Sequence, residues 1–264
     1  MQLHLYTTDP SGLDLAAVLG EDDHFTAVIV PKNRENAKKV LAVREQSEWP
    51  VTLHTPGSPL PEETPQADAI ISWLYSQIIS VDLLNSYPRG GINMHGGRIP
   101  DYRGANVLNW AIANGETELG VTWHEIVEKV DAGGILVDSS VSIRPNDTAI
   151  DIRATMITEG IRTFPEALQR FCDGAPPVRV PELQEGKVWQ SRRPEHARIE
   201  LGWDRTRVWN MIRAQTGPWP DAMIKVEGAW RPVHGIVTSD APGLIPYKTS
   251  DGSVIFLVPS DILL

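Results

Sequence analysis

The sequence from residue 90 to 97 reads Gly90-Gly91-Ile92-Asn93-Met94-His95-Gly96-Gly97, and this stretch decides how the rest of the chain is interpreted. It is a short apolar segment between glycine pairs, interrupted by two polar side chains at positions i and i+2. On a β-strand this spacing directs both side chains to one face, so Asn93 and His95 would stand side by side. Open α/β sheets bind ligands beyond the carboxyl ends of their strands. A strand that ends at His95 would place the pair in such a crevice.

Strand-like and helix-like segments alternate in the first third of the chain. Apolar runs of strand length occupy residues 25–30 and 69–74, and the second run is nearly continuous, as in a parallel strand that helices cover on both faces. Helical spacing occurs at residues 13–19, 34–46 and 81–86. The alternation predicts an α/β fold with a Rossmann-like, mostly parallel sheet.

Beyond His95, further helix-like and β-like segments flank a third candidate polar residue, Asp131. Residues 105–114 have helical spacing, and residues 119–127 and 134–143 have β-like composition. The loop between these two β-like segments carries Asp131, which would be free to fold back toward Asn93 and His95. A long amphipathic helix is expected from residue 147 to about residue 172.

The remaining chain is expected to form a separate, smaller domain. Gly174-Ala175-Pro176-Pro177 ends the helical pattern, and β-like segments follow at residues 222–226, 230–238 and 254–258. We therefore expect a Rossmann-like catalytic domain at residues 1–180 and a small, mainly β carboxyl-terminal domain at residues 181–264. The β-rich tail leaves a homodimer open as an alternative to a monomer.

The charge balance excludes one class of partner. The 264 residues include 24 basic and 34 acidic side chains, which gives a formal net charge of −10. Proteins that bind nucleic-acid polymers usually carry a basic stripe, because they must neutralise phosphates. A nucleic-acid polymer is therefore not an expected partner, although a local basic site for a small phosphate is compatible with the composition.

Cysteine and histidine usage argues against a metal site. Cys172 is the single cysteine, so neither an intramolecular disulfide nor a cysteine-based zinc site can form. The seven histidines show no short ligand spacing, and no metal is predicted. The start of the chain lacks signal-peptide features, and no apolar run approaches the roughly 18 residues of a spanning helix. We expect a cytoplasmic protein without a membrane partner.

The segment after the first strand argues against a dinucleotide cofactor. It reads Tyr6-Thr7-Thr8-Asp9-Pro10-Ser11-Gly12 and contains neither the glycine fingerprint of nicotinamide-binding folds nor a Walker sequence. The sheet is expected to be Rossmann-like without a nicotinamide cofactor.

Asn93, His95 and Asp131 together have the functional groups that acyl transfer to an amine requires. A neutral His95 can accept the proton that the amine loses, and Asn93 can donate a hydrogen bond to the oxyanion. Asp131 can orient the imidazole and stabilise its charged form. No covalent enzyme nucleophile is needed. The alternative remains open at this point, because Asn and His at a strand end are often turn and capping groups, and Asp131 precedes an ordinary loop sequence.

These residues lie in a pattern that resembles the folate-dependent formyltransferases. The family motifs are matched with their spacing at Asn93-Met94-His95-Gly96, Pro100-Asp101-Tyr102-Arg103-Gly104, Asn109-Trp110-Ala111-Ile112, Gly120-Val121-Thr122 and Asp131-Ala132-Gly133. The resemblance covers nearly the whole chain and is densest between residues 70 and 140. It implies N10-formyltetrahydrofolate as the formyl donor, with Asn93, His95 and Asp131 as the catalytic residues.

The resemblance also implies where the donor binds. Ser76, Gln77 and Ile78 align with the family loop whose backbone receives the pterin. Val130 and Asp131 belong to the loop that would form the other wall of the pocket.

Three residues beside the catalytic motif are candidates for acceptor binding. The family usually has Ser-Leu-Leu-Pro where this chain has Gly97-Arg98-Ile99-Pro100, so Arg98 is a candidate anion contact. A solvated loop arginine is the alternative. Tyr102 and Arg103 belong to the segment that most resembles the sugar formyltransferases, and Arg103 is a candidate for positioning the acceptor or its phosphate. Its alternative is a structural arginine that ties the loop to a carboxylate.

The resemblance favours a nucleotide-activated amino sugar, UDP- or dTDP-linked, as the acceptor. Family members that act on initiator tRNA resemble one another in a basic insertion after the second strand and in a larger carboxyl-terminal domain, and this chain has neither feature. Transfer to another amine (methionyl-tRNA, an amino acid or an antibiotic precursor) stays open as an alternative. So do hydrolysis of formyltetrahydrofolate by the same three residues and a non-enzymatic folate sensor.

Overall fold

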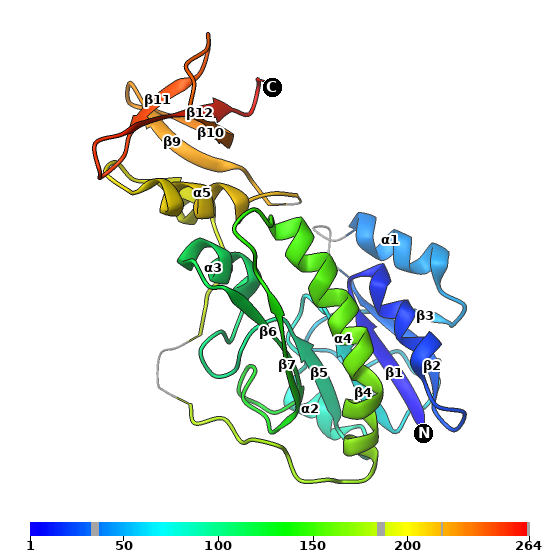
Figure 1. Ribbon diagram of the computed structural model, residues 1–264. Helices are drawn as coiled ribbons and strands as arrows, with labels where there is room; N and C mark the ends of the chain where they lie inside the picture. The colour runs from blue at the N-terminus through cyan, green and yellow to red at the C-terminus, as the bar shows by residue number, and fades with distance from the viewer. Residues whose placement is uncertain (33–36, 184–187, 218, 263–264) are drawn as a thin grey trace. The chain divides into compact units, whose positions relative to one another are not determined.

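The computed structural model of the protein describes residues 1–32, 37–183, 188–217 and 219–262 (Figure 1). The chain forms two compact units. The first contains Met1–Arg103, Gly120–Ser140 and Ile157–Lys187, and the second contains Gly104–Leu119, Val141–Met156 and Val188–Leu264.

The larger of the two described sheets has seven strands. Its strands follow the order β3-β2-β1-β4-β5-β6-β7. The bounds are β1 (Gln2–Thr7), β2 (His24–Pro31), β3 (Val51–His54), β4 (Ala69–Trp73), β5 (Gly91–His95), β6 (Glu118–Glu125) and β7 (Ile135–Ser142). The pairs β1–β2, β2–β3, β1–β4 and β4–β5 are parallel, whereas β5–β6 is antiparallel. The predicted α/β fold with a mostly parallel sheet is confirmed.

The helices between residues 37 and 172 lie close to the predicted segments. They are α1 (Ala37–Gln46), α2 (Val81–Asn85), α3 (Val107–Asn114) and α4 (Ala149–Cys172). The start predicted at residue 34 lies outside the described residues. The segment predicted as a helix at 13–19 is a 3₁₀ helix, η1 (Pro10–Val18), where the Asp9 side chain accepts a hydrogen bond from the Ser11 amide and Pro10 begins the first turn.

Packing against α4 settles which face of the sheet carries the polar pair. Trp73, Trp123 and Phe164 are fully buried between the sheet and α4. At Gly160 of α4 a Cβ atom would lie 2.8 Å from Trp73 and 3.4 Å from Met94, so this glycine lets the helix approach closely. Met94 therefore faces α4, which crosses the sheet in Figure 1. Because neighbouring strand residues alternate in direction, Asn93 and His95 face away from the helix.

The second unit contains a five-stranded sheet in the order β11-β12-β10-β9-β8. Its elements are η2 (Pro194–Ala197), β8 (Arg198–Ile199), α5 (Arg205–Arg213), β9 (Ala222–Val226), β10 (Ala229–Val237), β11 (Ile245–Lys248) and β12 (Val254–Pro259). Val208 and Ile212 of α5 pack with Ile224, Val233 and Leu257 in one core. The predicted carboxyl-terminal β-rich region is thus present, and three of its strands coincide with predicted segments.

The sequence analysis did not predict β8 and β11. β8 has two residues, which is too short for a pattern, and β11 contains Pro246, which is tolerated because β11 is an edge strand. The second unit also includes Gly104–Leu119 and Val141–Met156, which the expected boundary near residue 180 assigns to the catalytic domain. The domain boundary stays a prediction. Among the described residues, no helix has both the length and the apolar composition that a membrane span requires.

Candidate active site

The pairing of β5 with β6 brings a second polar pair beside the first. Asn93 is the partner of His124, and His95 is the partner of Thr122. Residues directly opposite each other in an antiparallel pair share a face. Accordingly, Asn93 Nδ2 lies 3.1 Å from His124 Nε2.

Asp131 folds back to this cluster from the loop between β6 and β7. Its Oδ2 lies 3.5 Å from His95 Nδ1, and its Oδ1 lies 3.5 Å from His124 Nε2. The loop can approach because residue 133 is glycine: a Cβ atom there would lie 1.9 Å from the carbonyl oxygen of Glu125. The structure therefore brings together Asn93, His95 and Asp131, three residues that the sequence analysis selected as catalytic. Their catalytic roles stay predictions.

The backbone of Tyr102 fixes the proton arrangement of His95. His95 Nε2 lies 2.5 Å from the Tyr102 carbonyl oxygen, which can only accept a hydrogen bond, so Nε2 carries a proton. The neutral ring then has its lone pair on Nδ1, on the side of Asp131. We expected Asp131 to orient the imidazole and to stabilise its charged form, and both roles stay predictions. The Tyr102 carbonyl accepts a hydrogen bond that also orients the ring, and at 3.5 Å the Asp131 carboxylate is close enough to act through its charge.

Burial keeps His95 in its basic form. It lowers the pKa of the imidazole below the ordinary value of 6.5, and the charge of Asp131 and the hydrogen bond to Tyr102 oppose this effect. The positive charge of Arg103 lowers the pKa further. His95 is therefore uncharged at neutral pH and available to accept a proton.

Arg103 ties the loop of Asp131 to the end of the catalytic motif. It is 6% exposed, and its Nε and Nη2 lie 2.9 Å and 2.5 Å from the Val130 carbonyl oxygen. The contact matches the structural alternative considered for this residue, except that the partner is a carbonyl instead of a carboxylate. Its predicted contact with the acceptor stays a prediction.

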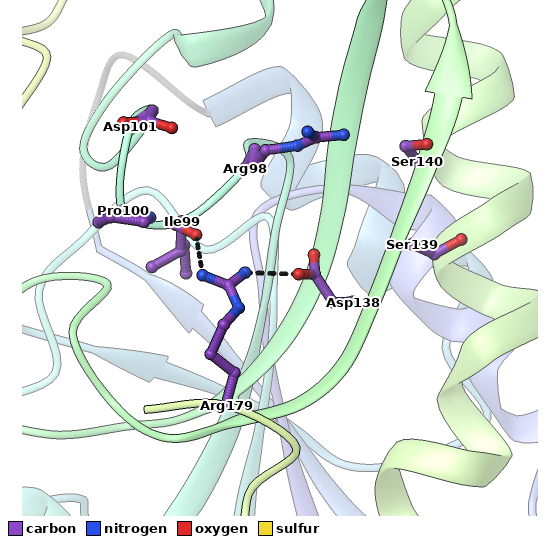
Figure 2. Close-up of a pocket in the computed structure, with 8 residues that line it drawn as sticks. All are labelled: Arg98, Ile99, Pro100, Asp101, Asp138, Ser139, Ser140 and Arg179. Atoms are coloured by element: carbon purple, nitrogen blue, oxygen red, sulfur yellow. Dashed lines mark hydrogen bonds and ion pairs between the residues drawn. The ribbon is translucent and has the colours of Figure 1, made fainter. Parts of the chain in front are cut away.

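Arg98 lies in a cavity of about 450 Å³ at the same end of the unit. Figure 2 shows the residues around this cavity: Arg98, Ile99, Pro100, Asp101, Asp138, Ser139, Ser140 and Arg179. Arg179 donates to the Ile99 carbonyl over 2.8 Å and pairs with Asp138 at 2.5 Å. The cavity thus has two arginines and two aspartates.

Thr122 links this cavity to the catalytic cluster. It is the strand partner of His95, and its Oγ1 lies 3.4 Å from Asp138 Oδ1. Asp138 is therefore on the same face as His95 and about two strand spacings away, roughly 10 Å.

The loop predicted to receive the donor follows β4. Trp73 at the end of β4 is the parallel partner of Met94, so this loop begins level with the carboxyl end of β5. The Ser76 amide donates to Thr8 Oγ1 over 3.0 Å, which fixes the start of the loop, and the Ile78 side chain is 67% exposed. Val130, on the other predicted wall, is 37% exposed. Backbone groups beside exposed apolar side chains suit a flat heterocyclic ring, and the predicted contacts of Ser76, Gln77, Ile78, Val130 and Asp131 with the donor stay predictions.

A sequence profile of the formyl transferase family matches residues 20–168, more than half of the chain. The chain belongs to the formyl transferase family. The predicted family and enzyme class are confirmed, and a formyltetrahydrofolate cosubstrate fits this family.

Solved structures with the same fold include sugar formyltransferases. WlaRD, described as a sugar 3N-formyl transferase, matches with a TM-score of 0.68 and 16% identity over 100% of this chain and 99% of its own. A 4-N formyltransferase from Francisella tularensis gives a TM-score of 0.68 and 17% identity over 87% of this chain and 94% of its own. HypX from Aquifex aeolicus gives a TM-score of 0.63 and 23% identity over 97% of this chain, which spans 45% of HypX. At these identities the likeness shows the fold.

His124 of this formyltransferase was not among the site residues predicted from the sequence. Its signal was the alternation in Val121-Thr122-Trp123-His124, which puts Thr122 and His124 on one face of a strand. The position of that strand beside β5, antiparallel to it and with Asn93 opposite His124, could not be deduced from the alternation. Among the described residues, no group of three or more His, Cys, Asp or Glu side chains could hold a metal ion.

Proposed function

We propose that this formyltransferase transfers the formyl group of N10-formyltetrahydrofolate to the amine of a nucleotide-activated amino sugar, UDP- or dTDP-linked. The convergence of Asn93, His95 and Asp131 at the carboxyl end of β5 supports the reaction, because it joins a hydrogen-bond donor, a neutral base and a charge. When bound, formyltetrahydrofolate supplies the formyl carbon that the amine nitrogen attacks.

His95 transfers the proton in this reaction. Nδ1 accepts the proton that the attacking amine loses, and the nearby charge of Asp131 stabilises the imidazolium that forms. The Tyr102 carbonyl keeps the ring in place because Nε2 donates to it throughout. His95 then returns the proton to the departing nitrogen as the bond between that nitrogen and the formyl carbon breaks. The products are a formamide and tetrahydrofolate, and the enzyme returns to its starting state.

Asn93 stabilises the charge that develops on the formyl oxygen. Its Nδ2 has two hydrogens, one directed at His124 and one available for the oxygen. A preorganised donor of this kind typically contributes about 10²–10³ in kcat.

Two observations support the choice of acceptor. Tyr102-Arg103-Gly104 and Asn109-Trp110 resemble the sugar formyltransferases in sequence, and solved structures with this fold include one obtained in the presence of dTDP and 5-N-formyl-THF. Arg98 is the proposed contact for an anionic group of the acceptor, from the cavity about two strand spacings from His95. The single cysteine fits a reducing, cytoplasmic location.

An acceptor screen tests the proposal. Formyltetrahydrofolate is incubated with dTDP- and UDP-linked amino sugars, free amino sugars and methionyl-tRNA, and formamide products are measured by mass spectrometry. We expect a product from a nucleotide-linked amino sugar, and none with the His95→Ala enzyme. If no sugar gives a product, the proposal is wrong. Rapid formate release without any amine would instead identify a formyltetrahydrofolate hydrolase.

A further inference from the structure

His124 contacts two of the three predicted catalytic side chains, but the reaction proposed above assigns it no role. It is 3% exposed, and its Nε2 lies 3.1 Å from Asn93 Nδ2 and 3.5 Å from Asp131 Oδ1. His124 is on β6, whereas Asn93 is on β5 and Asp131 is on the loop after β6. We propose that His124 is a positioning residue that sets the orientation of the Asn93 carboxamide, an inference that rests on the proposed formyl transfer.

A backbone carbonyl determines what His124 can offer to Asn93. His124 Nδ1 lies 2.8 Å from the carbonyl oxygen of Glu125, which has no proton to give, so Nδ1 carries a proton and donates. The inference concerns the uncharged form of the ring, in which the lone pair is on Nε2, the atom that lies 3.1 Å from Asn93 Nδ2. That atom can only accept a hydrogen bond, so Asn93 must present its NH₂ group and not its oxygen.

This constraint decides whether Asn93 can do its chemistry. With the NH₂ group at His124, the second hydrogen on Nδ2 remains for the formyl oxygen. With the carboxamide rotated by a half turn, Asn93 Oδ1 would face the His124 lone pair. No hydrogen on Nδ2 would then point to the formyl oxygen. A carboxamide has two orientations of nearly the same shape, so its partners and not its packing select between them.

The surrounding strands hold the constraint rigidly. Asn93 and His124 are directly paired across β5 and β6, and the Glu125 amide donates to the Gly134 carbonyl over 2.9 Å. The carbonyl that fixes His124 therefore belongs to a residue with its own backbone hydrogen bond. Groups held on paired strands keep their geometry better than groups on free loops.

Two matched substitutions separate positioning from packing. In His124→Gln the side-chain amide reaches the place of Nε2 and can still accept from Asn93, whereas in His124→Asn the amide reaches only the place of Nδ1. We expect kcat to fall about 30-fold in His124→Asn, with KM for both substrates within about threefold. His124→Gln should recover most of that loss. Equal losses of kcat in both variants, or losses that follow a lower melting temperature, would overturn the inference.

A double-variant cycle with Asn93 gives a second test. If His124 acts through Asn93, the His124→Asn change should alter kcat by less than about twofold when residue 93 is already alanine. A residue that only supports the fold would lower the activity of the Asn93→Ala enzyme by the same factor as that of the wild type. Multiplying losses would therefore contradict the proposal.

A measurement without turnover separates this inference from the proposed function. The side-chain amide signal of Asn93 in a ¹⁵N–¹H NMR spectrum is assigned by its absence in Asn93→Ala. One of its protons should be protected from exchange with solvent in the wild type and in His124→Gln, and exposed in His124→Asn. This result with no formyl transfer to any acceptor would support the inference and refute the proposed function. An active enzyme whose Asn93 signal is the same in all three proteins would refute the inference and leave the proposed function intact.

Discussion

The catalytic cluster and the arginine cavity lie on the same face of one sheet, yet they are built differently. His95 and His124 are 6% and 3% exposed, and backbone carbonyls fix the proton position of each ring. In the cavity, the Arg179 and Asp138 side chains are 40% and 32% exposed. Buried polar groups depend strongly on each partner, whereas an exposed ion pair is worth about 0–1 kcal/mol. The rigid cluster suits the proposed chemistry, and the more exposed cavity suits the proposed binding of the acceptor.

The largest effect should follow from removing the base. We expect His95→Ala to lower kcat by about 10²–10⁴, because no other group in the cluster can accept the proton at that position. The unfolding temperature should change little compared with this loss. Steady-state formation of the formamide measures the effect, and exposed His234 offers a matched control as His234→Ala. A His95→Ala enzyme with near wild-type kcat would remove the distinction between cluster and cavity.

Asp131→Asn should change both the rate and its pH dependence. His95 must be neutral to act, so kcat/KM rises with pH through its pKa, which burial holds below 6.5. Asp131 raises that pKa, so its neutralisation should move the acidic limb of the profile to lower pH. The rate at neutral pH should fall by about 10-fold or more, because the imidazolium is no longer stabilised. A limb that moves to higher pH would contradict this electrostatic account.

Arg103→Lys tests which of two interpretations of Arg103 is correct. Lysine keeps the charge but cannot reproduce two parallel donors to the Val130 carbonyl. If Arg103 is a tether, kcat should fall about 10-fold with the acceptor KM nearly unchanged, and stability should fall by about 1–3 kcal/mol in denaturant unfolding. If Arg103 binds the acceptor, the KM for the acceptor should rise instead. The acceptor site would then extend from the cavity to the cluster of Asn93, His95 and Asp131.

The smallest effect is expected from the cavity itself. Arg98→Ala should raise the acceptor KM about fivefold and leave both kcat and the KM for formyltetrahydrofolate unchanged, because one exposed charge contact is lost. Arg98→Lys is the matched control and should keep most of the affinity. If neither change affects the acceptor KM, Arg98 is a solvated loop residue.

The sequence was most informative where one strand or helix decides the answer. The apolar run that became β4 and the pair Asn93 and His95 were read directly, because a period of two residues defines the two faces of a strand. The family pattern then supplied Asp131. Contacts between elements could not be predicted from the sequence. The pairing of Asn93 with His124, for example, depends on the register of an antiparallel strand in a mostly parallel sheet. The partners of His95 and Arg103 are backbone carbonyls, which leave no mark on residue identity.

In the loop from Arg98 to Arg103, the main chain and the side chains contact different sites. The Tyr102 carbonyl holds the base, whereas the Arg98 and Asp101 side chains line the cavity. A carbonyl oxygen is common to all amino acids, so substitutions at residues 98, 101 and 102 can alter what the enzyme recognises while the base keeps its orientation. If the cavity binds the acceptor as proposed, acceptor preference can diverge, in nature or under laboratory selection, while the proton-accepting His95 stays in place.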